Sequence, residues 1–101
     1  MQLILIRHGE TLWNKEGRVQ GTSDVELSVA GKKQAELLAL SLKDHPLKDI
    51  QIHRGLMEMD QGDFEGFSFK ELMVGEKEFL KKWITDPVSV KMPNGESLSE
   101  L

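Results

Sequence analysis

The chain opens with Gln2-Leu3-Ile4-Leu5-Ile6, which runs directly into Arg7-His8-Gly9-Glu10-Thr11. A short, unbroken aliphatic run fits a strand that is buried on both faces, as in a parallel α/β sheet. The carboxyl ends of such strands open onto the crevice in which ligands bind. The sequence therefore predicts a strand over residues 2–6 that delivers Arg7 and His8 to a site.

The following residues predict a βαβ unit. Residues 9–26 are polar and punctuated by glycine, which indicates a long loop. A helix is expected to begin after Ser28, a good N-cap, and to end at Pro46. Its apolar face repeats at helical spacing: Ala35, Leu38, Ala39 and Leu42. Residues 49–53 alternate polar and apolar and predict a second strand, parallel to the first.

The second half predicts a loop over 56–67 and then a helix. Ser68 and Glu71 form a capping box at the helix start, and Pro87 ends the helix. Gly75 is its weak point, since glycine within a helix costs about 1 kcal/mol relative to alanine. The residues expected on its inner side are Phe69, Leu72, Met73, Phe79, Leu80 and Trp83. Residues 93–95 (Pro-Asn-Gly) predict a turn, and Ser97 to Glu100 predict another capping box.

Composition places this chain among soluble globular proteins. Its 101 residues are enough for a single domain over 1–101, and 39% of them are hydrophobic and 30% charged. The net charge of -4 argues against a nucleic-acid partner. The chain has no cysteine, and no early apolar run is long enough for a signal peptide or a membrane span. We therefore expect a cytoplasmic protein without a membrane partner.

The residues after the first strand suit phosphoryl chemistry. Arg7 offers a planar fork that matches phosphate oxygens, and His8 is a neutral nitrogen nucleophile near neutral pH. Gly9 lets the backbone approach an oxyanion closely. The purely structural alternatives are that His8 is a buried histidine at the end of a strand and that Arg7 caps a loop.

The order of the motifs resembles that of the histidine phosphatase (phosphoglycerate mutase-like) superfamily, and the spacing is most similar to its compact phosphatases. The resemblance implies a three-layer α/β fold with a parallel sheet, of phosphoglycerate mutase-like type and incomplete in this chain. It rests on residues 7–14 (Arg-His-Gly-Glu-Thr-Leu-Trp-Asn), 20–21 (Gln-Gly), 27–28 with Gly31 and 34–35, 56–58 followed by 62–66, and 93–97 (Pro-Asn-Gly-Glu-Ser).

The resemblance also implies roles for individual residues. His8 attacks phosphorus and becomes phosphohistidine, while Arg7 and Asn14 bind the phosphate oxygens with help from Gln20 and Gly21. Glu58 protonates the leaving oxygen and later activates water; the bland alternative for Glu58 is a solvated loop carboxylate. No metal and no cofactor are implied.

Two departures from the family pattern bear on activity. The family carries a second phosphate-binding arginine after its second strand and a second catalytic histidine on a late strand, and neither has a counterpart here. Residues 50–53 run straight into what resembles the third strand, without the dozen or so residues that a parallel crossover needs. Arg54 is nearby, but its context does not match, so it is not assigned the missing role.

The sequence thus predicts a phosphomonoester hydrolase that acts through phosphohistidine on a small phosphorylated metabolite. The alternatives are phosphoryl transfer of the phosphoglycerate mutase type, and a truncated, inactive relative that binds phosphate-bearing ligands. The oligomeric state stays open.

Overall fold

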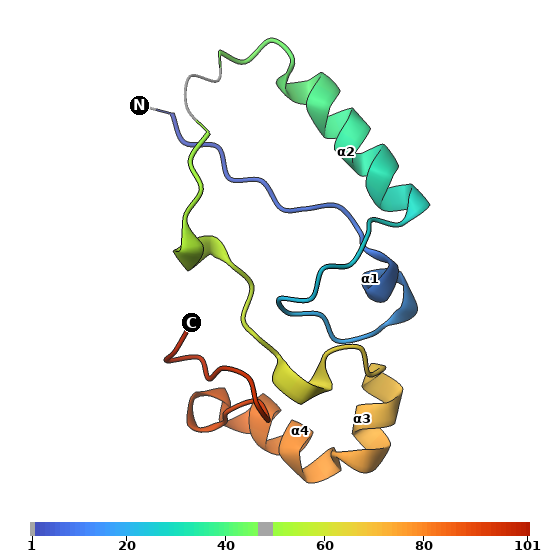
Figure 1. Cartoon of the computed structure of the whole chain (residues 1–101), viewed down its shortest axis with the longest axis vertical. Coiled ribbons are helices and arrows are strands. Elements are labelled where there is room, and N and C mark those ends of the chain that lie inside the picture. Colours follow the sequence, from blue (N-terminus) through green and yellow to red (C-terminus); the bar gives the residue numbers. More distant parts are fainter. Residues whose placement is uncertain (1, 47–49) are drawn as a thin grey trace.

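The computed structural model describes residues 2–46 and 50–101 (Figure 1), and most of its core residues come from the second half of the chain. The α-helices within these residues are α1 (Leu12–Glu16), α2 (Val29–Leu42), α3 (Phe69–Gly75) and α4 (Lys77–Thr85). Short 3-10 turns cover Arg54–Leu56, Gly62–Phe64 and Pro87–Ser89. The radius of gyration is 16.5 Å. A compact domain of this length has about 13 Å, so the chain is unusually extended.

The two predicted strands are not formed. Residues 2–6 and 50–53 carry no strand assignment, and Asp49 lies outside the described residues. Pairing in the described part of the chain is limited to three isolated antiparallel bridges: Thr11 with Leu27, Arg18 with Ser68, and Lys91 with Ser97. A parallel strand pair needs a long crossover between its strands. The residues between the two aliphatic segments, which include α2, are long enough for that crossover, so the length of the connection does not explain the missing pair. Within the described residues, neither segment pairs with a neighbour.

Helix α2 begins as predicted. Ser28 Oγ accepts a hydrogen bond from the Gly31 backbone N–H at 3.0 Å, which is an N-cap contact. The helix ends at Leu42, four residues before the expected stop at Pro46. Its apolar face is poorly covered, since Leu38 and Leu42 are half-buried and Ala35 and Ala39 are exposed. In Figure 1 the helix flanks the extended N-terminal segment.

The predicted helix after Ser68 is divided in two. The capping box is present, because Ser68 Oγ accepts from Glu71 N–H and the Glu71 carboxylate accepts from Ser68 N–H. Helix α3 ends at Gly75, the predicted weak point, and α4 starts at Lys77. The expected inner side is correct for Leu72, which is 4% exposed. It is wrong for Phe69 and Met73, which are 54% and 65% exposed.

In the core, one side of α3 and of α4 packs against two loops. It consists of Val19, Met59, Phe64, Leu72 and Met92, with Phe79, Leu80 and Trp83 packed against it. The Phe64 and Phe79 rings meet edge to face at 4.9 Å, a favoured aromatic geometry. The expected packing role of Trp83 is therefore confirmed. No helix within residues 2–46 and 50–101 is long and apolar enough to cross a membrane.

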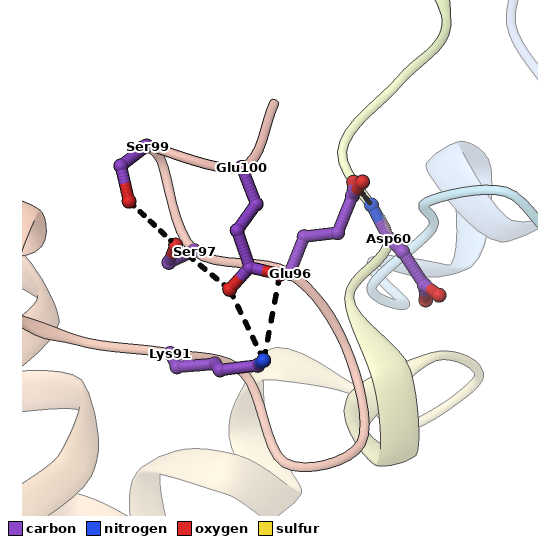
Figure 2. Close-up of polar contacts among 6 residues, drawn as sticks. All are labelled: Asp60, Lys91, Glu96, Ser97, Ser99 and Glu100. Carbon is purple, nitrogen blue, oxygen red and sulfur yellow. Dashed lines mark hydrogen bonds and ion pairs between the residues drawn. The ribbon is translucent and has the colours of Figure 1, made fainter.

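A short C-terminal hairpin closes the core (Figure 2). Asp60 and Glu96 exchange two hydrogen bonds, from Asp60 N–H to the Glu96 carboxylate and from Glu96 N–H to the Asp60 carbonyl, each 2.8 Å long. Lys91 Nζ pairs with Glu100 at 3.1 Å. The turn predicted over 93–95 is present, with Asn94 at a positive φ of 54°. The capping box predicted from Ser97 to Glu100 forms a turn rather than a helix start.

Candidate functional site

The residues that follow the aliphatic segment line a hollow of about 490 Å³, here called the His8 hollow. It brings together four of the sequence-predicted site residues from three segments of the chain: Arg7, His8, Asn14 and Gln20. The other lining residues are Gly9, Glu10, Gly17, Arg18, Gln34 and Phe69. Arg7 and His8 are exposed, so both side chains are open to a solute.

The His8 ring is oriented by its own neighbour. Nδ1 of His8 lies 2.7 Å from the carbonyl oxygen of Gly9. Because a carbonyl oxygen can only accept, this hydrogen bond requires the proton to be on Nδ1. In the neutral ring, Nε2 then carries the lone pair, which is the state that a nitrogen nucleophile needs.

Asn14 reaches the hollow from α1, a helix within the stretch 9–26 for which the sequence predicts a single loop. Thr11 and Asn14 form a capping box: Thr11 Oγ1 accepts from Asn14 N–H, and Asn14 Oδ1 accepts from Thr11 N–H, each at 3.1 Å. The Thr-x-x-Asn spacing could have indicated this helix start, although the third residue of a capped helix is usually glutamate or glutamine. The cap occupies Asn14 Oδ1 and leaves the amide NH₂ as the group that can donate to a ligand.

Gln20 and Gly21 lie side by side, but only Gln20 lines the hollow. Thr11 Oγ1 donates to Gln20 Oε1 at 2.5 Å, so the Gln20 NH₂ is also free to donate to a ligand. Gly21 is buried, and its N–H donates to the Glu65 carboxylate at 3.0 Å. Of the two residues predicted to help bind phosphate, Gln20 lines the hollow, while the Gly21 amide is engaged by Glu65.

Glu65 fastens the 21–23 loop. Its Oε1 accepts from Gly21 N–H, from Ser23 N–H at 2.8 Å and from Ser23 Oγ at 2.6 Å. Partial burial by itself would raise the pKa of Glu65, but these hydrogen bonds outweigh it and hold the pKa below the ordinary value. A charged Glu65 thus positions the backbone next to Gln20.

Hydrogen bonds anchor residues 9–10 to the first half of α2. Glu10 N–H donates to Gln34 Oε1 at 2.9 Å, and Ser28 N–H donates to the Glu10 carbonyl at 2.9 Å. A side chain at Gly31 would collide with the Glu10 carbonyl oxygen, so glycine is needed there. The first turn of α2 and residues 9–10 therefore behave as one unit.

Glu58 does not share this hollow. It lines a second one, of about 460 Å³, with Thr22, Arg54, Gly55, Met57, Asp60, Glu96, Glu100 and Leu101. Its Oε1 accepts from the Met59 N–H at 2.9 Å. The predicted nucleophile and the predicted proton donor thus lie in two separate hollows.

Arg18 is the lining residue that the sequence analysis overlooked. It follows Gly17, which ends α1 in the left-handed conformation with φ of 69°. The signal was present, since a glycine after a capped turn indicates that the chain reverses and returns toward the helix start. Within the described part of the chain, no group of three or more His, Cys, Asp or Glu side chains is arranged to hold a metal ion.

Curated relatives match the whole chain, including the following two. It is 34% identical to "Phosphoserine phosphatase 1" of Hydrogenobacter thermophilus and 30% identical to "Probable phosphoglycerate mutase GpmB" of Escherichia coli. The chain spans about three fifths of their length, 59% and 58% respectively. Both alignments extend over 124 positions although this chain has 101 residues, so the relatives carry residues without a counterpart here.

Solved structures of similar fold superpose on most of the chain. A putative alpha-ribazole-5'-P phosphatase from Escherichia coli superposes on 93% of this chain with a TM-score of 0.72 and 28% identity. An alpha-ribazole phosphatase from Shigella flexneri superposes on 94% with a TM-score of 0.73 and 27% identity. Each match covers 58% of the solved chain.

The family pattern matches the chain in two pieces. The pattern of the "Histidine phosphatase superfamily (branch 1)" covers residues 3–52 and 47–101. The break falls where the crossover residues were expected to be absent, and together the two pieces include nearly every residue. The chain belongs to the histidine phosphatase superfamily.

Proposed function

We propose that this chain is a phosphomonoester hydrolase that uses His8 as its nucleophile. The observation that carries the proposal is the hydrogen bond from His8 Nδ1 to the Gly9 carbonyl, which leaves Nε2 as the basic nitrogen within a hollow lined by Arg7, Asn14 and Gln20. Membership of the superfamily and the names of the relatives support phosphoryl chemistry at the family level.

The first half of the reaction is displacement at phosphorus. Nε2 of His8 forms a bond to phosphorus, while the bond from phosphorus to the ester oxygen breaks with its electron pair. The transition state spreads charge over the three equatorial oxygens, so donors arranged around them accelerate the step. Arg7 and the amide NH₂ groups of Asn14 and Gln20 are these donors. The product is phosphohistidine and an alkoxide that requires a proton.

The second half is hydrolysis of phosphohistidine. Water attacks phosphorus, the bond to Nε2 breaks, and inorganic phosphate leaves with the ring restored. Glu58 is proposed as the acid that protonates the leaving oxygen and as the base that then takes a proton from water. A general acid must come within hydrogen-bond reach of that oxygen, and such contacts often tighten only in the substrate complex. The Glu58 role therefore requires the 54–60 loop to close toward the His8 hollow when substrate binds.

The substrate class is a small phosphorylated metabolite. The relatives named as phosphatases favour water as the acceptor, and the relative named as a probable mutase represents the alternative, in which an organic hydroxyl accepts the phosphoryl group. The two reactions share the phosphohistidine step. They differ in whether inorganic phosphate is released from a monoester without an added acceptor.

The decisive experiment measures phosphate release from p-nitrophenyl phosphate by the purified chain. The variant His8→Ala should abolish release, and His53→Ala is the matched control because His53 is exposed and bonded only to the Gln51 side chain among described contacts. An acid-labile, base-stable phosphoenzyme should form in the wild type alone. Equal release by wild type and His8→Ala would overturn the proposal and leave a phosphate-binding relative without turnover.

A further inference from the structure

We infer that Arg18 is a second phosphate-binding arm of the His8 hollow, acting with Arg7 on the oxygens of the same phosphoryl group. The inference rests on the proposed function for the location of the phosphoryl group. It goes beyond it by assigning a residue that neither the motif resemblance nor the sequence pattern indicated. The starting observation is that Arg7 and Arg18 line one hollow although ten residues of loop and helix α1 separate them.

The backbone of Arg18 is held from both sides. Its N–H donates to the Trp13 carbonyl at 2.9 Å, in the last turn of α1. Its two neighbours pair with the segment before α3, because Val19 N–H donates to Phe67 and Phe69 N–H donates to Gly17. Arg18 and Ser68 accordingly form an antiparallel bridge. The point from which the side chain extends is thus set by hydrogen bonds and does not depend on a ligand.

The side chain, in contrast, is available. Arg18 Nε lies 3.1 Å from the Glu16 carboxylate, and the Arg18 side chain is 45% exposed. Exposed ion pairs of this kind are weak, because water screens them and two long side chains must be ordered. The contact uses Nε on one edge of the guanidinium. The two terminal NH₂ groups at its end form a second edge that fits phosphate bidentately.

Charge favours the same assignment. The chain carries a net charge of -4, so a phosphate dianion is repelled by the molecule as a whole. Within the hollow, one carboxylate, that of Glu10, is directed into a hydrogen bond from Ser28 Oγ at 2.7 Å. A single guanidinium would leave the dianion half neutralised. Arg18 supplies the second positive charge on the lining of the hollow.

The test is binding of inorganic phosphate to the purified chain by isothermal titration calorimetry at low ionic strength. Arg18→Gln should weaken binding about ten-fold, the size of one lost charge-assisted contact. Arg18→Lys should recover part of the loss, since it keeps the charge without the fork. Glu16→Gln is the matched control and should bind phosphate as well as the wild type or more tightly, because it releases Arg18 from its competing partner.

The outcomes separate this inference from the proposed function. Phosphate binding that depends on Arg18, in a chain without turnover, would sustain the inference and reject the hydrolase. Binding that is unchanged in Arg18→Gln but lost in Arg7→Gln would overturn the inference and leave the hydrolase in place. Unchanged thermal unfolding of Arg18→Gln excludes a merely structural loss. Wild-type chain that binds no phosphate would also overturn the inference.

Discussion

A Cβ atom placed on Gly9 would lie 2.6 Å from the carbonyl oxygen of Gly31, so the backbone beside His8 and the first turn of α2 are in direct contact. Neither position has room for a side chain, because a methyl group on Gly31 would in turn meet the Glu10 carbonyl. The orientation of His8 depends on this contact, since the carbonyl that holds its ring belongs to Gly9.

Gly31→Ala should therefore separate α2 from residues 9–10 and disorder the His8 hollow. Overpacking of a close backbone contact costs about 1–3 kcal/mol, and phosphate binding should fall together with stability. Gly55→Ala is the control, because a Cβ on Gly55 meets nothing within 4 Å. Thermal unfolding and phosphate titration of both variants check this expectation. Equal behaviour of the two variants would contradict it.

Asn14→Asp separates the two functions of Asn14. The carboxylate keeps the acceptor that receives Thr11 N–H, so the cap of α1 survives. The NH₂ donor is replaced by a negative charge that faces the bound anion. We expect unfolding to be unchanged while phosphate affinity falls by about ten-fold or more, the scale of a charge-assisted hydrogen bond. A loss of helix signal in circular dichroism would instead show that Asn14 matters chiefly as the cap of α1.

Glu65→Gln tests the loop fastening through its pH dependence. Folding lowers the pKa of Glu65, so its charged form stabilises the folded chain above the ordinary value of 4.5. That contribution is lost as the pH falls from there through the lowered value in the folded state. Near pH 7 the variant should be less stable by about 1–2 kcal/mol, the scale of hydrogen bonds to a charged group.

The difference between wild type and Glu65→Gln should then shrink as the medium is made more acidic than the lowered pKa. Urea unfolding at several pH values measures it. Glu36→Gln, on the exposed side of α2, serves as the comparison. A stability difference that stays constant in acid would mean that the charge of Glu65 is not what fastens the loop.

Leu72→Ala should destabilise the core around α3. Leu72 is 4% exposed, and buried leucine-to-alanine changes cost about 2–5 kcal/mol. Val74→Ala, at a position 87% exposed on the same helix, should change stability little. Denaturant unfolding distinguishes them. Similar midpoints for the two variants would show that α3 is not packed as the structure has it.

The isolated chain should unfold at a low temperature for its family. Its aliphatic segments are exposed, with Leu3 at 79% and Ile52 at 95%, so burial that normally drives folding is missing. Calorimetry is the measurement. A cooperative transition above about 65 °C, the upper end for ordinary domains, would contradict the expectation.

The sequence predicted local structure well wherever the interaction was local. The caps at Ser28 and Ser68 and the turn over 93–95 depend on residues within a few positions of one another, and all three are present. The strand over 2–6 depends on partners elsewhere in the chain. Its apolar pattern predicted a strand wrongly, because the pattern cannot supply the partner strand, and residues 2–6 form no strand in the structure.

Part of the candidate site was also predictable, because it is formed by residues close together in the sequence. Arg7 and His8 are adjacent in sequence, and Asn14 and Gln20 follow within one loop and a short helix, so their meeting in one hollow is a local event. Whether Glu58 joins them depends on how two distant loops approach, which no spacing in the sequence encodes. Arg18 was overlooked because its position depends on the left-handed turn at Gly17 and on the pairing with Ser68.

The double hydrogen bond between Asp60 and Glu96 has a mechanical consequence (Figure 2). Both backbone groups of Asp60 are held by a residue 36 positions further along the chain. Glu58 lies two residues before Asp60, so its position depends on the C-terminal hairpin. The hairpin thus helps to position the proposed acid. Substitutions in the hairpin should alter proton transfer although no hairpin residue contacts the phosphoryl group.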